Sequence, residues 1–176
     1  MKTLILGAVG AGVLWTLARP AGATTNGRHT VTLQHFSPSE FRQWWPHMSA
    51  DLLRKLDRFR AEWGAPVRIS PVEGGIGRHL GPDDTSQHNL DRWGEVRAVD
   101  VFPMVPDGAG GYGYIHTRAD RERAYQVARA VGFTGVGLYT DTTPGDMLHV
   151  DVRPAQTLAT WSRINGQYKG VRAVLV

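Results

Sequence analysis

The chain has 176 residues, of which 41% are hydrophobic, and it contains no cysteine. This length suits one compact domain with a hydrophobic core and a short extension. The formal net charge is +4, and acidic residues interleave with the basic ones, which excludes the dense basic runs of a nucleic-acid binder. Without cysteine there are no disulfides and no thiolate ligands, so any zinc must be bound by His, Asp or Glu.

The N-terminal residues have the features of an export signal. Lys2 precedes an apolar run over residues 3–18, and the small residues Ala21-Gly22-Ala23 follow it. A basic start, a short apolar run and an A-x-A site are typical of a secretory signal peptide. The run is shorter than the roughly 20 residues that span a bilayer. We expect residues 1–23 to be a signal peptide, with a weak membrane anchor or a buried helix as the alternatives.

A polar stretch separates this segment from the rest of the chain. Residues 24–36 contain Asn26-Gly27 and are predicted to be a linker, with a short strand at residues 31–33 leading into the domain. One domain is expected over residues 37–176, without internal repeats.

Two helices are predicted at the start of this domain. Ser37 or Ser39 can cap the first helix, which Pro46 interrupts. Ser49 caps the second helix, which runs to about Trp63. Its apolar residues recur at steps of three and four, which indicates one buried face; they are Leu52, Leu53, Leu56, Phe59 and Trp63.

Short strands and one further helix follow. The predicted strands cover residues 67–70, 96–102, 135–139 and 147–152, and the helix covers residues 118–131. A long loop over residues 71–92 is rich in Gly, Asp and His, and long loops in compact domains are often functional. The fold class is therefore α+β, as a small antiparallel sheet with helices packed on one side.

Four residues suggest metal-dependent hydrolysis. His88, Asp100 and His149 can supply three zinc ligands, which leaves a fourth position for water, and Asp146 can act as the general base. Because side chains alternate along a strand, Asp151 shares a face with His149 and is either a carboxylate that orients a ligand or a ligand itself. An arginine partner is the rival explanation for a carboxylate at position 100 of an apolar strand.

At these residues the chain resembles the M15 family of zinc peptidases. The family pattern is S-x-H, then A-x-D, then D/E-x-x-H, and here it corresponds to Ser86-Gln87-His88, Ala98-Val99-Asp100 and Asp146-Met147-Leu148-His149. Flanking features also match, namely Ile69-Ser70, the glycine-rich run that ends at Tyr139, and Trp161. The family includes D-alanyl-D-alanine carboxypeptidases, dipeptidases and phage endolysins that cut L-alanyl-D-glutamate bonds.

The resemblance implies the small α+β fold of that family. It also implies a zinc site formed by His88, Asp100 and His149, with Asp146 as the base. The implied substrate is a peptidoglycan stem peptide, cut either as a carboxypeptidase or as an endopeptidase.

The chain departs from the family pattern in two places. Eleven residues separate His88 from Asp100, which is longer than the family spacer. The arginine that usually follows the Ile-Ser pair and stabilises the oxyanion is absent, and Arg78 is the nearest candidate for that role. A non-catalytic wall-binding or phage structural or lysis protein on the same fold is therefore the alternative hypothesis.

These expectations extend to partners and location. We expect a monomer that is exported to the periplasm or cell envelope, or secreted, and that binds no nucleic acid. Membrane contact is expected only through residues 1–23, if these are not cleaved. A phage-encoded protein associated with the virion or the host envelope fits the same resemblance.

Overall fold

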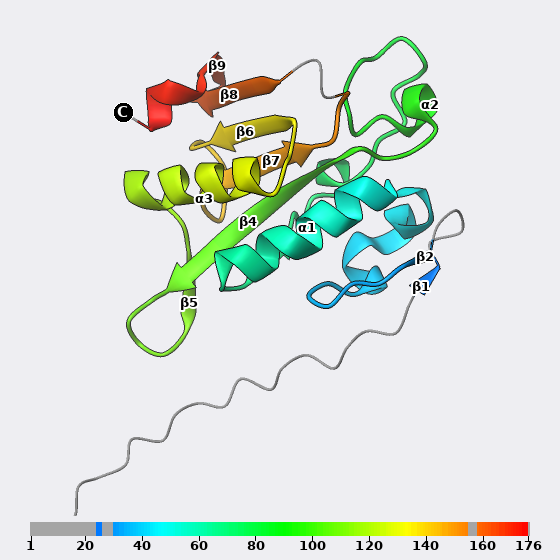
Figure 1. The fold of residues 1–176 in the computed structure, drawn as a ribbon. Coiled ribbons are helices and arrows are strands. Elements are labelled where there is room, and N and C mark those ends of the chain that lie inside the picture. Colours follow the sequence, from blue (N-terminus) through cyan, green and yellow to red (C-terminus); the bar gives the residue numbers. More distant parts are fainter. Residues whose placement is uncertain (1–23, 26–29, 155–157, 176) are drawn as a thin grey trace, which may run out of the picture.

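A computed structural model describes residues 24–25, 30–154 and 158–175 (Figure 1). The predicted signal segment and residues 26–29 of the predicted linker lie outside these described residues. None of the described helices is long and apolar enough to cross a membrane. Thr24–Thr25 (β1) and Thr30–Val31 (β2) pair as a two-stranded sheet at the start of the domain.

A seven-stranded sheet forms the centre of the molecule. Its strand order is β3-β4-β7-β6-β8-β9, and β5 pairs with β4 outside this path. The strands are Val67–Ile69 (β3), Ala98–Pro106 (β4), Tyr112–Tyr114 (β5), Gly135–Tyr139 (β6), Met147–Asp151 (β7), Ala159–Ile164 (β8) and Gln167–Gly170 (β9). The four predicted strands correspond to β3, β4, β6 and β7.

The α+β class is confirmed, but the prediction of an antiparallel sheet is wrong in one respect. β6 and β8 are parallel, whereas all the other pairs of this sheet are antiparallel, so the sheet is mixed. The reason is the position of β8. It pairs with the edge of β6 that faces away from β7, although β7 is the strand before it in the sequence. Since β6 and β7 run in opposite directions, a strand that returns beyond β6 runs parallel to it.

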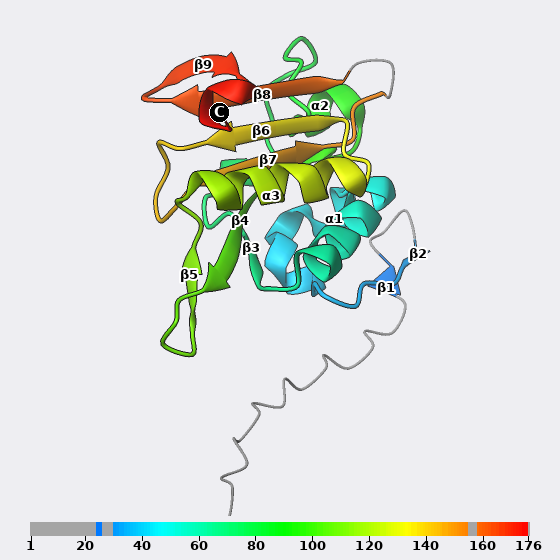
Figure 2. The same cartoon turned by 60° about the vertical axis from the view of Figure 1, so that its left-hand side comes forward.

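The two long helices lie on the same face of this sheet, as predicted (Figures 1 and 2). They are α1 (Ala50–Trp63) and α3 (Arg118–Ala130). The apolar face of α1 is fully buried, and α3 contributes the small residues Ala124 and Ala128. Shorter helical segments are η1 (Pro38–His47), η2 (Glu73–Gly75), α2 (Leu90–Trp93) and η3 (Val171–Val174).

Alternation along the strands divides the side chains between the two faces of the sheet. Val99 and Val101 of β4, with Leu148 and Val150 of β7, belong to the main hydrophobic core under the helices. The residues between them, including Asp100 and His149, therefore point to the opposite face. We call this opposite surface the site face.

One row of the site face brings distant segments together. Asp100 of β4 pairs with His149 of β7, which pairs with Gly137 of β6, which in turn pairs with Trp161 of β8. These four residues thus lie side by side across four strands, although they span more than 60 positions of the sequence. The register of the sheet, and not proximity in sequence, assembles this row.

Two glycines of β6 leave room for large side chains on this face. A Cβ atom at Gly137 would lie 2.5 Å from the Trp161 indole, and one at Gly135 would lie 2.0 Å from the Asp151 carboxylate. Both distances are far below van der Waals contact. Only glycine therefore lets Trp161 and Asp151 lie flat over β6.

Gly135→Ala should therefore destabilise the protein. The new methyl group would overlap the buried Asp151 carboxylate, and overpacking of this kind costs about 1–3 kcal/mol of folding free energy. Urea unfolding measures the loss. Gly170→Ala in β9 is the matched control, because nothing lies within 4 Å of the added Cβ atom. Equal stability of the two variants would contradict this account of β6.

Candidate metal centre

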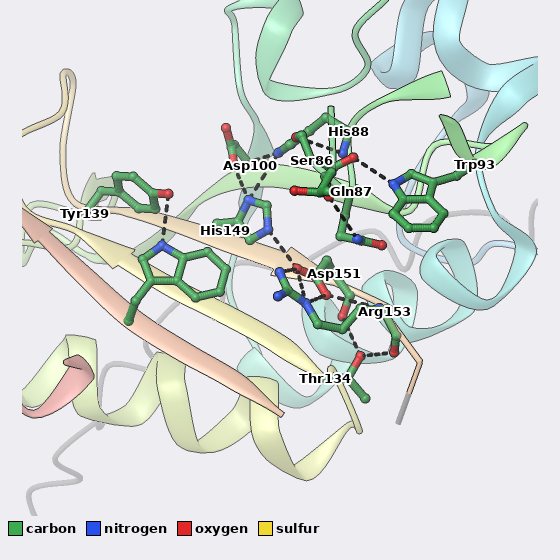
Figure 3. Close-up of polar contacts among 12 residues, drawn as sticks. Ser86, Gln87, His88, Trp93, Asp100, Thr134, Tyr139, His149, Asp151 and Arg153 are labelled. Atoms are coloured by element: carbon green, nitrogen blue, oxygen red, sulfur yellow. Dashed lines mark hydrogen bonds and ion pairs between the residues drawn. The ribbon is translucent and has the colours of Figure 1, made fainter. Parts of the chain in front are cut away.

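Three predicted ligands converge on one point of the site face. His88 Nε2 lies 3.1 Å from His149 Nδ1, and Asp100 Oδ1 lies 2.9 Å from His149 Nδ1 and 3.5 Å from His88 Nε2 (Figure 3). All three side chains are buried, with at most 7% of each residue exposed. The structure therefore brings together the whole ligand set predicted from sequence, including the two residues separated by the long spacer.

The remaining ring nitrogens fix the tautomers of both imidazoles. His88 Nδ1 lies 2.9 Å from the carbonyl oxygen of Ile76, and His149 Nε2 lies 3.1 Å from Asp151 Oδ2. A carbonyl oxygen and a carboxylate oxygen only accept hydrogen bonds, so each of these nitrogens carries the proton. In the neutral rings the two facing nitrogens, His88 Nε2 and His149 Nδ1, then carry lone pairs.

This arrangement fits a metal ion. Two lone pairs and a carboxylate oxygen point at one another in a buried space, which is unfavourable unless a cation lies between them. Ligands 2.0–2.1 Å from a tetrahedral zinc are about 3.3 Å apart, and the three atoms already lie 2.9 to 3.5 Å apart. Each of the three residues, His88, Asp100 and His149, thus offers one atom with which the group could bind a single metal ion.

Electrostatics in the metal-free chain lead to the same conclusion. Burial lowers the pKa of His149, but hydrogen bonds and charges from Asp100 and Asp151 outweigh it and raise that pKa to about 9. Burial raises the pKa of Asp100, but the two imidazoles hold it well below its usual range. Without a metal, a proton on His149 supplies the positive charge that this cluster requires.

The long spacer after His88 folds into a compact unit that returns the chain to β4. Asn89 caps α2, and its side-chain amide donates to the carbonyl oxygens of Gly81 and Asp84 at 2.7 and 2.9 Å. Gly94 ends α2 in the left-handed conformation, and the Arg97 N–H then donates to the Gln87 carbonyl oxygen. The extra residues thus form α2 and its flanking turns, and they leave the His88–Asp100 contact intact.

Asp151 contacts His149 in the way that the first of its two predicted roles, orienting a ligand, requires. Its carboxylate accepts from His149 Nε2 and from the Arg153 guanidinium, and it is completely buried. Burial raises the pKa of Asp151, but Arg153 and His149 together hold it well below its usual range. An ionised Asp151 keeps the proton of His149 on Nε2 and so keeps Nδ1 free for a metal.

The ligand cluster lies in the wall of a cavity of about 510 Å³. This volume is in the range of small-molecule sites. Besides the ligands, the lining includes aromatic and cationic side chains, namely Tyr139, Trp161, Tyr168, Arg78, Arg153 and Arg163. Arg153 is paired with Asp151 and Arg163 with Asp141. The cavity therefore suits a small molecule or peptide with anionic and apolar parts.

Arg78 reaches this cavity, as the sequence predicted. Its Nε donates to the Gly74 carbonyl oxygen at 2.6 Å, and its backbone N–H donates to the carbonyl oxygen of His88. Among the described residues no carboxylate forms an ion pair with Arg78. Its guanidinium is therefore the one lining cation whose charge is not balanced within the described part of the chain.

Asp146, the predicted general base, does not reach the cavity. It is buried, its carboxylate binds Arg121 of α3 at 2.8 Å, and its N–H donates to the carbonyl oxygen of Ile115. It precedes His149 by three residues, and α3 lies on the helix-covered face. The sheet therefore separates Asp146 from the ligand atoms, and this geometry does not support its role as a base.

Several residues of the cavity were not assigned a role from sequence. Arg153 follows Asp151 by two positions, which the period of a strand could have indicated. Arg163 and Tyr168 belong to the β8–β9 hairpin, which was not predicted. Its signal was Asn165-Gly166, a pair typical of tight hairpin turns, and both residues have positive φ angles.

Comparisons with family models, with curated proteins and with solved structures found no match to this chain. The resemblance to the M15 peptidases thus rests on the residues quoted above, and the fold of that family stays a prediction.

Replacing Asp151 should weaken metal binding. In Asp151→Asn the charge that fixes the His149 tautomer is lost, and changes of this kind cost about 10- to 100-fold in metal affinity. Calorimetric titration of the chelator-treated protein with zinc measures the effect. Asp146→Asn is the matched control, since Asp146 is also buried and arginine-bound but lies on the other face. Weaker zinc binding in the control alone would contradict the assignment.

The metal-free protein should lose stability as the pH rises from about 6.5 to 9. The pKa of His149 is about 9 in the folded protein and close to 6.5 when unfolded, so the folded state binds the extra proton across this interval. Asp100 and Asp151 titrate far below it and add no slope. Urea unfolding at several pH values with a chelator present measures the free energy. The slope should disappear in His149→Gln; a rise in stability over the interval would contradict the assignment.

Proposed function

We propose that this chain is a zinc-dependent peptidase that hydrolyses peptidoglycan stem peptides. The observation that carries the proposal is the convergence of His88 Nε2, His149 Nδ1 and Asp100 Oδ1 in the wall of a cavity. Three protein ligands, with a fourth position open to the cavity, are the arrangement of catalytic rather than structural zinc sites.

Zinc is the metal that suits these ligands best. Two imidazoles and one carboxylate form a mixed nitrogen and oxygen set, whereas magnesium and calcium prefer oxygen ligands alone. A bound zinc ion lowers the pKa of water to about 7 and so supplies hydroxide at neutral pH. Hydrolysis at this site therefore does not require Asp146.

The rest of the cavity favours a peptide with a free carboxylate or a developing oxyanion. Arg78 offers a guanidinium without an ionic partner, in the position for which the sequence predicted oxyanion stabilisation. Trp161 and Tyr139 form an aromatic wall beside the ligands. The stem peptides of peptidoglycan carry carboxylates, and the S-x-H, A-x-D and D-x-x-H pattern supports this substrate class.

One observation favours the alternative of a non-catalytic wall-binding or phage structural protein. Among the described residues that line the cavity, Asp100 is the only carboxylate, and it belongs to the ligand set. A site that binds metal and peptide but lacks an efficient proton acceptor would serve recognition without turnover. The two hypotheses differ in whether product appears.

The decisive experiment measures zinc content and peptide release together. The full chain should bind close to one zinc per molecule and should release soluble peptides from purified peptidoglycan. A chelator should abolish the release, and added zinc should restore it. His149→Ala should lose zinc and activity together, because the ligand is removed. Asp146→Asn should retain both.

The outcomes separate the hypotheses. Bound zinc with retention on peptidoglycan but no released peptide would support the binding protein and overturn the peptidase. Absence of zinc after loading would overturn the ligand set and the peptidase mechanism. Loss of activity in Asp146→Asn with zinc still bound would restore the predicted base.

A further inference from the structure

Tyr139 occupies a position next to the ligands that no step above uses. It is the last residue of β6, two residues beyond Gly137, which pairs with His149. Alternation therefore places Tyr139 on the site face, where it lines the same cavity as Asp100 and His149. Only 8% of the residue is exposed. Figure 3 shows its ring on the side of the ligand cluster away from Ser86 and Trp93.

The Tyr139 hydroxyl is oriented by a donor from the neighbouring strand β8. The Trp161 Nε1–H donates to it at 3.0 Å, and an indole nitrogen can only donate. The hydroxyl therefore acts as the acceptor in this contact. Its own proton can be donated within the cavity, where the neighbouring Tyr168 is its partner in the free chain and a substrate oxygen could replace that partner. Trp161 is itself held in place over Gly137, with its ring 5.1 Å from that of His149.

Two further contacts hold the phenol ring. The Arg163 guanidinium lies over it at 4.7 Å, and the Tyr168 ring packs edge-on at 6.1 Å. Burial raises the pKa of Tyr139 above its usual range, and the neighbouring Tyr168 and the Asp100 charge also raise it. The hydrogen bond from Trp161 lowers this pKa but does not outweigh them. The hydroxyl thus stays protonated over the whole physiological range.

We infer that Tyr139 is a catalytic residue of the proposed peptidase, whose hydroxyl donates a hydrogen bond to the oxygen of the scissile carbonyl as that oxygen becomes negative. The inference rests on the proposed function. Trp161 is then a positioning residue, because it acts through the hydroxyl it orients. Arg78 comes from the loop before β4 and Tyr139 from β6 beyond β7, so two donors from separate elements line the cavity.

Hydrolysis of the peptide bond needs no proton from Tyr139. Hydroxide oxygen bonds to the carbonyl carbon, and the electron pair of the C=O bond moves to its oxygen. The carbon–nitrogen bond then breaks, and the leaving amine takes the proton of the added hydroxyl. Tyr139 keeps its own proton throughout and stabilises only the negative oxygen, which is the part of the reaction where a fixed donor has most effect.

Tyr139→Phe removes only the donor and is the direct test. With full-length zinc-loaded protein and a stem-peptide substrate, kcat should fall about 100- to 1000-fold while KM and zinc content stay unchanged. Trp161→Phe keeps the hydroxyl but removes its anchor, so kcat should fall by less. Tyr125→Phe is the matched control, because Tyr125 packs against the core under the helices, and its activity should not change.

A tetrahedral phosphinate analogue of the stem peptide gives a second readout that needs no turnover. Tyr139→Phe should bind it about 100-fold more weakly, and bind the planar substrate as well as the wild type. Full activity of Tyr139→Phe in a protein whose wild type is active would overturn this inference alone. Loss of zinc in that variant would indicate a structural role and also overturn it. A zinc-loaded wild type that neither hydrolyses the peptide nor binds the phosphinate would overturn the proposed function and the inference together.

Discussion

Two imidazole nitrogens with lone pairs lie 3.1 Å apart on the site face, with a carboxylate oxygen 2.9 Å from one of them. The outer nitrogens of both rings are committed as donors, to a backbone carbonyl and to Asp151, so neither ring can turn to relieve the contact. Positive charge makes this cluster favourable in a buried space, supplied by a bound metal ion or, without one, by a proton on His149. The backbone of the 70–97 segment, the Asp151–Arg153 pair and the glycines of β6 all hold these rings where one cation could bind.

The sheet supplies the geometry that the ligands need. Asp100 and His149 are directly paired residues of adjacent strands, and His88 reaches them from the loop on the site face. Because paired side chains of neighbouring strands stand close together, strand pairing alone brings two of the three ligand candidates side by side, and Asp151 then orients the His149 ring. The parallel addition of β8 beyond β6 then extends the same row to Trp161, so the C-terminal segment completes the aromatic wall of the cavity.

Much of this arrangement could be predicted from sequence, because strong local patterns determine it. The three- and four-residue steps of α1 and the alternation of β4 and β7 gave the layers, and the ordered His88, Asp100 and His149 gave the ligand set. The β8–β9 hairpin was missed because its strands are half-exposed and carry no clean alternation, although Asn165-Gly166 marked its turn. The parallel pairing of β8 depends on which distant strand it pairs with, and local sequence patterns do not indicate this.

Asp146 and Asp151 lie on opposite faces of the sheet because one is an odd and the other an even number of residues from His149. Both carboxylates are buried and bound to an arginine, Arg121 in one case and Arg153 in the other. Asp151 lies two residues after His149 and so shares its face, whereas Asp146 lies three residues before it and faces α3. Proton transfer at the ligand cluster therefore has to use groups of the site face. In the described cavity these include the three ligand candidates, the arginines and the hydroxyls of Thr85, Ser86, Tyr139 and Tyr168. Under the proposed function, this set suits stabilisation of developing negative charge better than removal of a proton by a carboxylate.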